Sequence, residues 1–421
     1  MSRSLFIITQ KYPLLNAINI KLNCLNSKEA DLILDDDHDY VYELASKIIQ
    51  EGIFRRVFIF ESRRKNYIKD YFKKKGKPSL TNMLSELYLK LKDFVLFRFN
   101  LISYINNITT LGGKIDFTSY SDVYVCCTTR ASFACTDILE QIGNISTIHL
   151  VEEGVRDYCQ SSIIDQYIYR YRNLRIIQHL YDSELVSYEK RNIDYCDIPK
   201  LAKNDATVSI LNRVFGWNNK VACRAKLEEQ VIFFEQVAEP MPKHLSCTSF
   251  IKRLLLHNSI RKHKKEHLLF REKSSMIELL IEILSEQNKI DKFKIKAHPR
   301  TVNGIKDQWK SFVLDDVNNN RTNIPWELYC ANAELSDCKL ATLFSSSVVN
   351  SVLCLAQVPP VKIVLLYEFI GDRSGLPPDL VRFFHKARTK FPSIIYIPNN
   401  KEQLKSILLE PQLPKTDLLG V

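Results

Sequence analysis

The stretch LFIIT, residues 5–9, decides the fold. It is an unbroken apolar run of strand length, and such a run predicts a strand buried on both faces. The segment QKYP at 10–13 separates it from a helix-periodic stretch that begins at Leu14. A second strand is predicted at 30–34. Short apolar strands that alternate with amphipathic helices indicate βαβ units and a parallel sheet.

The same alternation continues through the rest of the chain. Further strands are predicted at 57–60, 123–127, 145–150, 231–234, 293–297, 341–344, 361–366 and 394–397. Helices are predicted between them, over 40–50, 133–142, 249–273 with a continuation over 276–286, and 347–355. The segment 62–110 breaks the pattern, because it is strongly basic at 63–77 and then suits one long helix over 80–104. It is interpreted as an insertion or lid, although a solvated helical face would explain it equally well.

These elements predict an α/β protein with two Rossmann-like domains that face a cleft, over residues 1–225 and 226–421. Ligands of such domains bind beyond the carboxyl ends of the strands. Neither half carries the G-x-G-x-x-G or Walker A pattern. Dinucleotide-dependent dehydrogenases and P-loop enzymes are therefore disfavoured.

Composition excludes some classes of protein but does not identify a binding partner. The 421 residues carry a formal net charge of +11, which attracts nucleic acid, sugar nucleotides, anionic glycans and acidic membranes alike. The 11 cysteines are scattered without a C-x-x-C pair, so the zinc-ribbon pattern is missing. The N-terminus lacks the apolar core of a signal peptide. Free thiols without an export signal predict a cytoplasmic protein.

Glu152-Glu153-Gly154 is the first candidate for chemistry, because it directly follows a predicted strand. Two adjacent carboxylates repel each other, and a low-dielectric cleft raises at least one of their pKa values toward the range of a general base. Glycine beside them permits a tight turn or a close ligand. An ordinary acidic turn that starts a helix would explain the same residues.

Two further candidates suit an anionic phosphate. His298-Pro299 lies between Lys296 and Arg300 at the end of a predicted strand, and an imidazolium can hydrogen-bond a phosphate oxygen and act as an acid toward it. Ser345-Ser346 precede a predicted helix, whose free N–H groups bind anions. A surface turn and a plain helix cap remain open as alternatives.

Two acidic segments remain. Glu327, after Pro325-Trp326, could accept hydrogen bonds from a ribose, or it could be a solvent-facing residue at a helix start. The triplet at 35–37 formally contains D-x-D, but it is interpreted as a polar turn. A base in one domain and a phosphate clamp in the other match what glycosyl transfer from a nucleotide donor requires.

In this order, the three motifs resemble those of the bacterial sialyltransferases of glycosyltransferase family 52 and the related polysialyltransferases. The opening LFIITQKYPLLNAINI is similar to their first strand and helix, and VIFFEQVAEP is similar to the strand that opens their second domain. The resemblance spans nearly the whole chain, but each motif is only two or three residues long. It implies a GT-B-type fold, with an acceptor-side domain followed by a domain that binds the nucleotide sugar.

The resemblance also implies a function: transfer of sialic acid from CMP-sialic acid to a cell-surface glycan acceptor, either a capsule or a lipooligosaccharide. Glu153 would deprotonate the acceptor hydroxyl, and Glu152 would orient or tune it. The Glu-Glu pair departs from the family pattern in having no Asp, which puts the position of the base in doubt. The family also includes members with other sugar donors.

On the donor side, the resemblance implies that His298, with Pro299, contacts the CMP phosphate and assists its departure. Ser345 and Ser346 would bind the same phosphate, and Glu327 the cytidine or its ribose. CMP leaves as a phosphate monoester, so neither a metal ion nor another cofactor is expected.

The densest positive charge lies at 252–253 and 261–265. A basic amphipathic helix can lie on an acidic membrane surface, which would place the enzyme on the inner face of the plasma membrane. A solvated helix face explains the same residues. Two other functions stay open, a transferase that uses another activated sugar or polyol phosphate and a basic nucleic-acid-binding protein. No recognised nucleic-acid-binding module is present, so no nucleic-acid partner is expected. A homodimer is left open.

Overall fold

The computed structural model describes residues 3–25, 28–36, 40–61, 104–126, 138–139, 142, 145–159, 173–187, 193–218, 221, 227–235, 257–298, 306–314, 324–371 and 376–410. The chain divides into two compact units. Unit 1 comprises Met1–Lys200 and Asn204–Gly216, and unit 2 comprises Leu201–Lys203 and Trp217–Val421. The boundary predicted at residue 225 lies outside the described residues.

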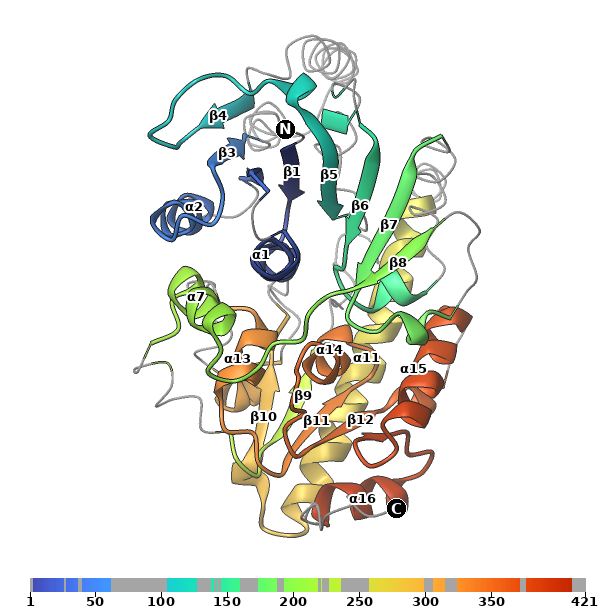
Figure 1. Ribbon diagram of the computed structural model, residues 1–421. Helices are drawn as coiled ribbons and strands as arrows, with labels where there is room; N and C mark the ends of the chain where they lie inside the picture. Colours follow the sequence, from blue (N-terminus) through green and yellow to red (C-terminus); the bar gives the residue numbers. More distant parts are fainter. Residues whose placement is uncertain are drawn as a thin grey trace, which may run out of the picture. The chain divides into compact units, whose positions relative to one another are not determined.

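Unit 1 is built on a sheet that has eight strands among the described residues, in the order β4-β3-β2-β1-β5-β6-β7-β8 (Figure 1). All neighbours pair in parallel except β4, which runs antiparallel to β3. The strands are β1 (Arg3–Ile8), β2 (Ala30–Asp35), β3 (Arg56–Phe60), β4 (Ile105–Asn107), β5 (Tyr120–Cys126), β6 (Thr147–Val151), β7 (Arg175–Leu180) and β8 (Asp194–Asp197). Its helices are α1 (Lys11–Cys24), α2 (Val41–Gln50) and α7 (Ala206–Phe215), with short 3-10 turns at Phe117–Ser119, Val155–Tyr158 and Ser183–Leu185.

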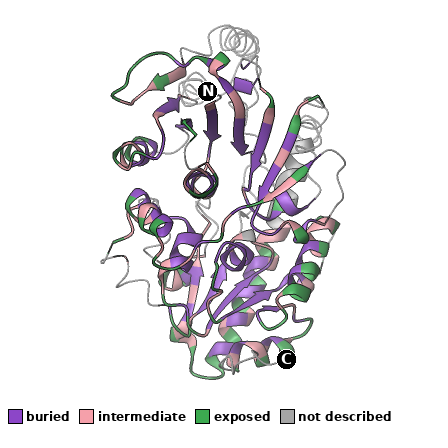
Figure 2. Ribbon diagram, in the orientation of Figure 1, coloured by how far each residue is buried: buried purple, intermediate pink, exposed green. Residues whose placement is uncertain are grey.

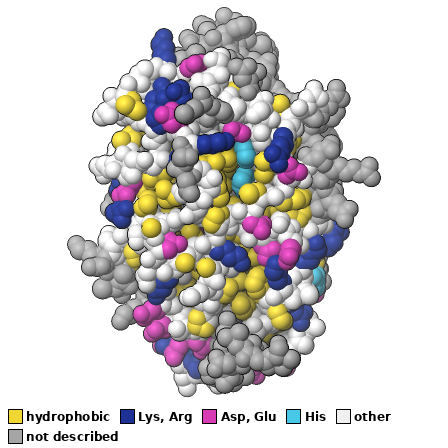
Figure 3. Space-filling model, viewed as in Figure 1, with side chains coloured by type: hydrophobic (Ala, Val, Ile, Leu, Met, Phe, Trp, Pro, Cys, Tyr) yellow, Lys and Arg dark blue, Asp and Glu magenta, His cyan; other side chains and the backbone are white. Residues whose placement is uncertain are grey.

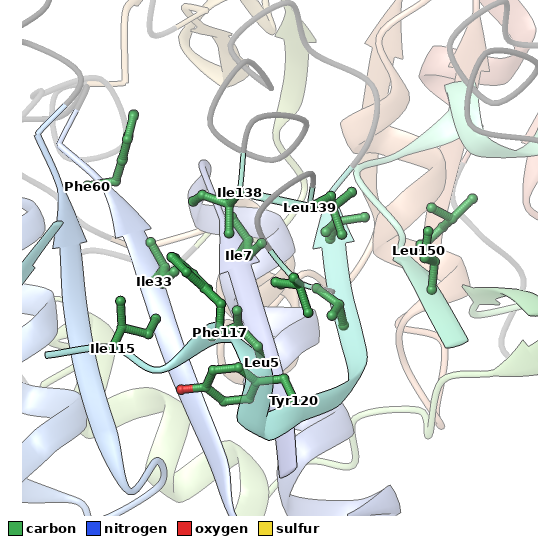
Figure 4. Close-up of a cluster of buried hydrophobic side chains, with 14 of the residues drawn as sticks. Leu5, Ile7, Ile33, Phe60, Ile115, Phe117, Tyr120, Ile138, Leu139 and Leu150 are labelled. Atoms are coloured by element: carbon green, nitrogen blue, oxygen red, sulfur yellow. The ribbon is translucent and has the colours of Figure 1, made fainter. Parts of the chain in front are cut away.

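The first strand explains why the sheet forms. Side chains alternate between the two faces of a strand, so an apolar run can be buried on both. Leu5 and Ile7 lie in a hydrophobic cluster with Ile138 and Leu139 (Figure 4). Phe6, between them, stacks on Tyr124 at 4.2 Å between ring centroids. Figure 2 shows the resulting burial along the central strands.

In the described part of unit 2, a five-stranded parallel sheet has the order β10-β9-β11-β12-β13 (Figure 1). The strands are β9 (Val231–Phe234), β10 (Phe293–Lys296), β11 (Cys338–Thr342), β12 (Val361–Leu365) and β13 (Ile395–Tyr396). The helices are α11 (His257–Ser285), α13 (Trp326–Asn332), α14 (Ser346–Leu353), α15 (Pro378–Lys390) and α16 (Lys401–Leu409), with 3-10 turns at Ile290–Lys292, Asp307–Phe312 and Tyr367–Phe369.

Both strand orders are those of doubly wound α/β domains. When the strands of unit 2 are numbered from its own first strand, their order in the sheet is 2-1-3-4-5. In unit 1 the parallel strands have the order β3-β2-β1-β5-β6-β7-β8, and the antiparallel strand β4 lies at the edge beside β3. In each order the chain reverses its direction of winding beside the first strand, and this switch point is where such domains bind ligands. The prediction of two Rossmann-like α/β domains is confirmed.

Several predicted elements need correction. The strand expected at 341–344 is β11, Cys338–Thr342, which begins earlier because Lys339 lies inside it. The Lys339 side chain is 5% exposed, and its ammonium lies 2.8 Å from the Asp337 carboxylate. The helical stretch expected over 249–273, with its continuation over 276–286, is one helix, α11, within the described residues, which begin at residue 257 there. Most of the predicted insertion lies outside the described residues, but its end forms β4 and belongs to the sheet.

The acidic triplet after β2 is also different from the expected polar turn. Asp35 is the last residue of β2, and both Asp35 and Asp36 are buried. The Asp36 N–H donates to the Phe60 carbonyl at 3.0 Å, which extends the pairing of β2 with β3. Asp37 lies outside the described residues.

The surface carries mixed charge. On the face seen in Figure 3, Lys and Arg side chains of the described residues are interspersed with Asp, Glu and apolar side chains. None of the helices that the structure describes is long and apolar enough to cross a membrane. Of the basic stretch, residues 261–265 lie in α11 and residues 252–256 lie outside the described part. Its contact with a membrane remains a sequence-based expectation.

Candidate active site

In unit 1, the Glu-Glu-Gly motif begins one residue after the end of β6, as predicted. The Glu152 side chain is fully buried, and its two carboxylate oxygens accept three hydrogen bonds. Tyr12 Oη donates to Oε1 at 2.7 Å, while Tyr158 Oη and the Tyr181 N–H donate to Oε2 at 2.7 and 2.9 Å. Burial raises the pKa of Glu152 and these hydrogen bonds lower it, with burial the larger effect. Enclosed in this way, Glu152 can position its neighbours but has no open side for a substrate.

The backbone of the motif is tied to the first helix. Asn16 Nδ2 donates to the Glu152 carbonyl at 2.9 Å, and Tyr181 Oη donates to Asn16 Oδ1 at 2.8 Å. Asn16 is itself buried on α1. The end of β6, the end of β7 and the first helix are therefore joined by one buried polar network. Networks of this kind are rigid when all members are satisfied.

Glu153 differs from its neighbour because its side chain is only half-buried. Its backbone is held by Asp157, whose Oδ2 accepts from the Glu153 N–H at 2.5 Å and from the Gly154 N–H at 3.3 Å. Gly154 has φ +139° and ψ −162°, a backbone conformation essentially restricted to glycine. Burial, and then the Glu153 charge, raise the pKa of Asp157 well above its usual value. Of the two glutamates, Glu153 is therefore the more exposed.

In unit 2, the switch point lies where β9 has β10 on one side and β11 on the other. The His298 N–H donates to Glu235 Oε2 at 3.1 Å, just past the ends of β10 and β9. On the other side, Thr342 Oγ1 donates to the Phe234 carbonyl at 3.2 Å and accepts from the Ser345 N–H at 2.9 Å. The structure thus ties His298 and Ser345 to the last residues of one strand.

Two of the predicted phosphate contacts, Ser345 and Ser346, lie at the start of α14. Ser345 is the N-cap residue of α14, and Ser346 is the first residue of that helix. Pro299 lies outside the described residues. The free backbone N–H groups of the first turn of a helix point outward along its axis, a geometry that suits an anion.

Glu327 lies in the first turn of α13 and is 4% exposed, which excludes the solvent-facing alternative. Asn350 Nδ2 donates to its Oε1 at 3.4 Å. Burial lowers the pKa of Lys296, and the nearby Glu327 charge opposes this shift. The Lys296 ammonium also lies 5.4 Å from the centroid of the Phe234 ring. Glu327 thus belongs to the buried layer beneath the carboxyl ends of β9 and β10.

Sequence reasoning missed the residues that hold the candidates in place. Each hydrogen-bonds a candidate motif or another residue that does, and all except the half-buried Tyr12 are buried. They are Tyr12, Asn16, Asp157, Tyr158, Tyr181, Glu235, Lys273 and Thr342. Within the described residues, no group of three or more His, Cys, Asp or Glu side chains could hold a metal ion.

Comparisons with known proteins give no family assignment. No protein-family model matches the chain, and no curated protein sequence matches it. Similar solved structures include UDP-GlcNAc 2-epimerase from Methanocaldococcus jannaschii, with 11% identity over 99% of this chain and 94% of that chain and a TM-score of 0.44. UGT89C1 of Arabidopsis thaliana complexed with UDP has 9% identity over 98% and 90%, with a TM-score of 0.46.

A third similar structure is the glycotransferase of kitacinnamycin, with 8% identity over 97% of this chain and 89% of that chain and a TM-score of 0.40. The α/β fold class of this chain rests on the strand orders of its two sheets.

Proposed function

We propose that this chain is a metal-independent glycosyltransferase of GT-B type that moves sialic acid from CMP-sialic acid to a cell-surface glycan. The supporting observation is the switch point of unit 2. There, His298 and Ser345 are both hydrogen-bonded to the end of β9 or to its partner Thr342, and α14 begins beside them. An imidazole, a hydroxyl and a helix N-terminus together suit the phosphate of a nucleotide donor.

In the proposed reaction, Glu153 takes the proton of the acceptor hydroxyl, whose oxygen then attacks the anomeric carbon of the sugar. The bond from that carbon to the phosphate oxygen breaks, and CMP leaves as a phosphate monoester. His298 donates a hydrogen bond or proton to the phosphate, while Ser345 and Ser346 bind its other oxygens. Glu152 and Asp157 position Glu153 through the backbone of the motif.

The remaining donor contacts are proposed on the same basis. Pro299 restricts the backbone of His298, because the residue before a proline favours an extended conformation. Glu327 is proposed to contact the cytidine or its ribose.

The identity of the sugar and base rests on the resemblance of short motifs to sialyltransferases. The alternative is a transferase of the same fold that uses another nucleotide-activated sugar or a polyol phosphate, since every such donor presents a phosphate to His298 and Ser345. We further propose that the enzyme acts in the cytoplasm, where its basic stretch at 252–265 contacts the inner face of the plasma membrane. Lipid-linked acceptors are found on such a surface.

A donor panel tests the function. Purified protein is incubated with CMP-sialic acid, other CMP-sugars and UDP-sugars, with and without a glycan acceptor, and nucleotide release is measured. We expect CMP-sialic acid to be consumed faster than the other donors by about tenfold or more. Preferential consumption of another donor would support the alternative, and no release from any donor would refute the assignment.

A further inference from the structure

We infer that Glu235 and Lys273 form a positioning pair that fixes the backbone of His298 for phosphate binding. This inference rests on the proposed function for its consequence, but its geometric part can be tested separately. Neither residue belongs to a motif that the sequence singled out for chemistry.

The pair lies at the switch point of unit 2. The Lys273 ammonium lies 2.5 Å from Glu235 Oε1, and the two side chains are 1% and 0% exposed. The other oxygen, Oε2, accepts the His298 N–H at 3.1 Å. The Glu235 N–H donates to the Lys296 carbonyl at 3.0 Å. Both the backbone and the side chain of Glu235 therefore link the end of β9 to the turn after β10.

Stability alone does not explain an ion pair in this place. Removing two charges from water costs much of what their attraction returns, so a pair of apolar side chains is often as stable or more so. The carboxylate does supply something that an apolar side chain cannot, an acceptor for the His298 N–H. Lys273 provides the opposite charge beside that buried acceptor.

Loss of the Glu235 acceptor should affect His298 and not Ser345. Pro299 has no N–H, so the His298 amide is the last backbone donor before it. Ser345 depends on a different contact, the hydroxyl of Thr342. Loss of the Glu235 acceptor should therefore disturb the part of phosphate binding that His298 supplies and leave the part supplied by Ser345.

The test compares two neutral replacements of the pair. E235Q/K273M keeps a carbonyl acceptor for His298, whereas E235L/K273M has none. A control variant, E278Q, breaks the exposed ion pair between Glu278 on the same helix and Lys306, which are 2.9 Å apart. For each full-length variant we would measure the affinity for CMP, the kcat and KM of CMP release, and hydrogen–deuterium exchange of the His298 amide. The E235L/K273M change is also combined with His298→Ala.

We expect E235L/K273M to weaken CMP binding about tenfold and to speed exchange of the His298 amide by at least about tenfold, the loss of one charge-assisted hydrogen bond. E235Q/K273M should recover both to within about threefold of the wild type. In the His298→Ala background, E235L/K273M should cause no further loss of CMP affinity, because the group that it positions is gone. If Glu235 and Lys273 only stabilised the fold, the loss of CMP affinity caused by E235L/K273M would add to the loss caused by His298→Ala.

Equal behaviour of the two neutral pairs would overturn the inference, as would additive losses with His298→Ala. If E235L/K273M does not fold, E235Q alone replaces it. Lys273 and His298 donate to different oxygens of Glu235, and E235Q keeps an acceptor at only one of these two positions. Adding K273M to E235Q frees that acceptor for His298 and should restore protection of the His298 amide, and failure to restore it would refute the pair. If the wild type binds neither CMP nor UDP, the proposed function fails, and the exchange measurement still decides the positioning.

Discussion

Replacing Glu152 tests the buried network that holds the Glu-Glu-Gly motif. We compare Glu152→Gln with Glu152→Leu, since both remove the carboxyl group and its burial penalty. Gln can place its carbonyl where Oε2 lies and accept from Tyr158 and from the Tyr181 N–H. Its amide group then faces Tyr12, whose hydroxyl can rotate to accept. Leu offers none of these partners.

The two variants should differ in unfolding free energy because Leu leaves hydrogen-bond donors without an acceptor. Tyr12 is half-buried, so water can replace Glu152 there. Tyr158 is 0% exposed and Tyr181 is 2% exposed, so their donors cannot reach water. The Tyr181 N–H keeps a 3.2 Å contact with Tyr158 Oη, which leaves the Tyr158 hydroxyl as the unsatisfied donor. At about 1–3 kcal/mol for one buried unsatisfied donor, unit 1 of Glu152→Leu should be less stable than that of Glu152→Gln by roughly 1–3 kcal/mol.

Urea denaturation near neutral pH, followed by far-UV circular dichroism, measures this difference. The chain has 3 Trp residues, at positions 217, 309 and 326, and all belong to unit 2. Tryptophan fluorescence therefore reports unit 2 as an internal control and should show the same midpoint in both variants. A difference in unfolding free energy below about 0.5 kcal/mol would refute the account of the network.

Three further predictions concern the same two strand ends. Gly154→Ala should destabilise unit 1 by about 1–3 kcal/mol, since φ +139° suits only glycine, and unchanged denaturation would contradict this. Because burial raises the folded-state pKa of Asp157 above its usual 3.8, its contribution to stability is lost as pH rises through the folded pKa. Asp157→Asn should therefore melt above the wild type near about pH 8, with the gap closing toward about pH 5, and parallel curves of melting temperature against pH would count against it. Thr342→Val removes the partner of the Ser345 N–H and should weaken CMP binding about tenfold in a titration, whereas Thr342→Ser should remain close to the wild type; equal affinities would exclude this role of Thr342.

The central strands could be predicted because they are apolar and short. β9 lies where expected, over Val231–Phe234, because its run of apolar residues ends at a charged one. β7 was missed because buried strands can carry polar residues, and β8 (Asp194–Asp197) because none of its four residues is buried. Gln178 and His179 lie in β7 and are 1% and 4% exposed, so the strand has no clean apolar signal. Burial of such groups depends on tertiary partners that local patterns do not contain.

The candidate site, too, could be predicted only in part from the sequence. Glu153, His298 and Ser345 could be placed at strand ends because each closely follows an apolar run that predicts a strand. Their supporting partners could not. Tyr12 and Glu152 are 140 positions apart in the sequence, and Glu235 is 38 positions from Lys273. Such contacts are set by the topology of the sheet, and no local spacing marks them.

The most direct test of the proposed function is the rate of CMP release from CMP-sialic acid by Glu153→Gln, measured with an acceptor at saturating donor and accompanied by a CMP titration. A general base contributes about 10²–10⁴-fold to the rate. We therefore predict that release falls by at least about 100-fold while CMP affinity stays within about threefold of the wild type. Release at the wild-type rate would contradict the assignment of Glu153 as the base.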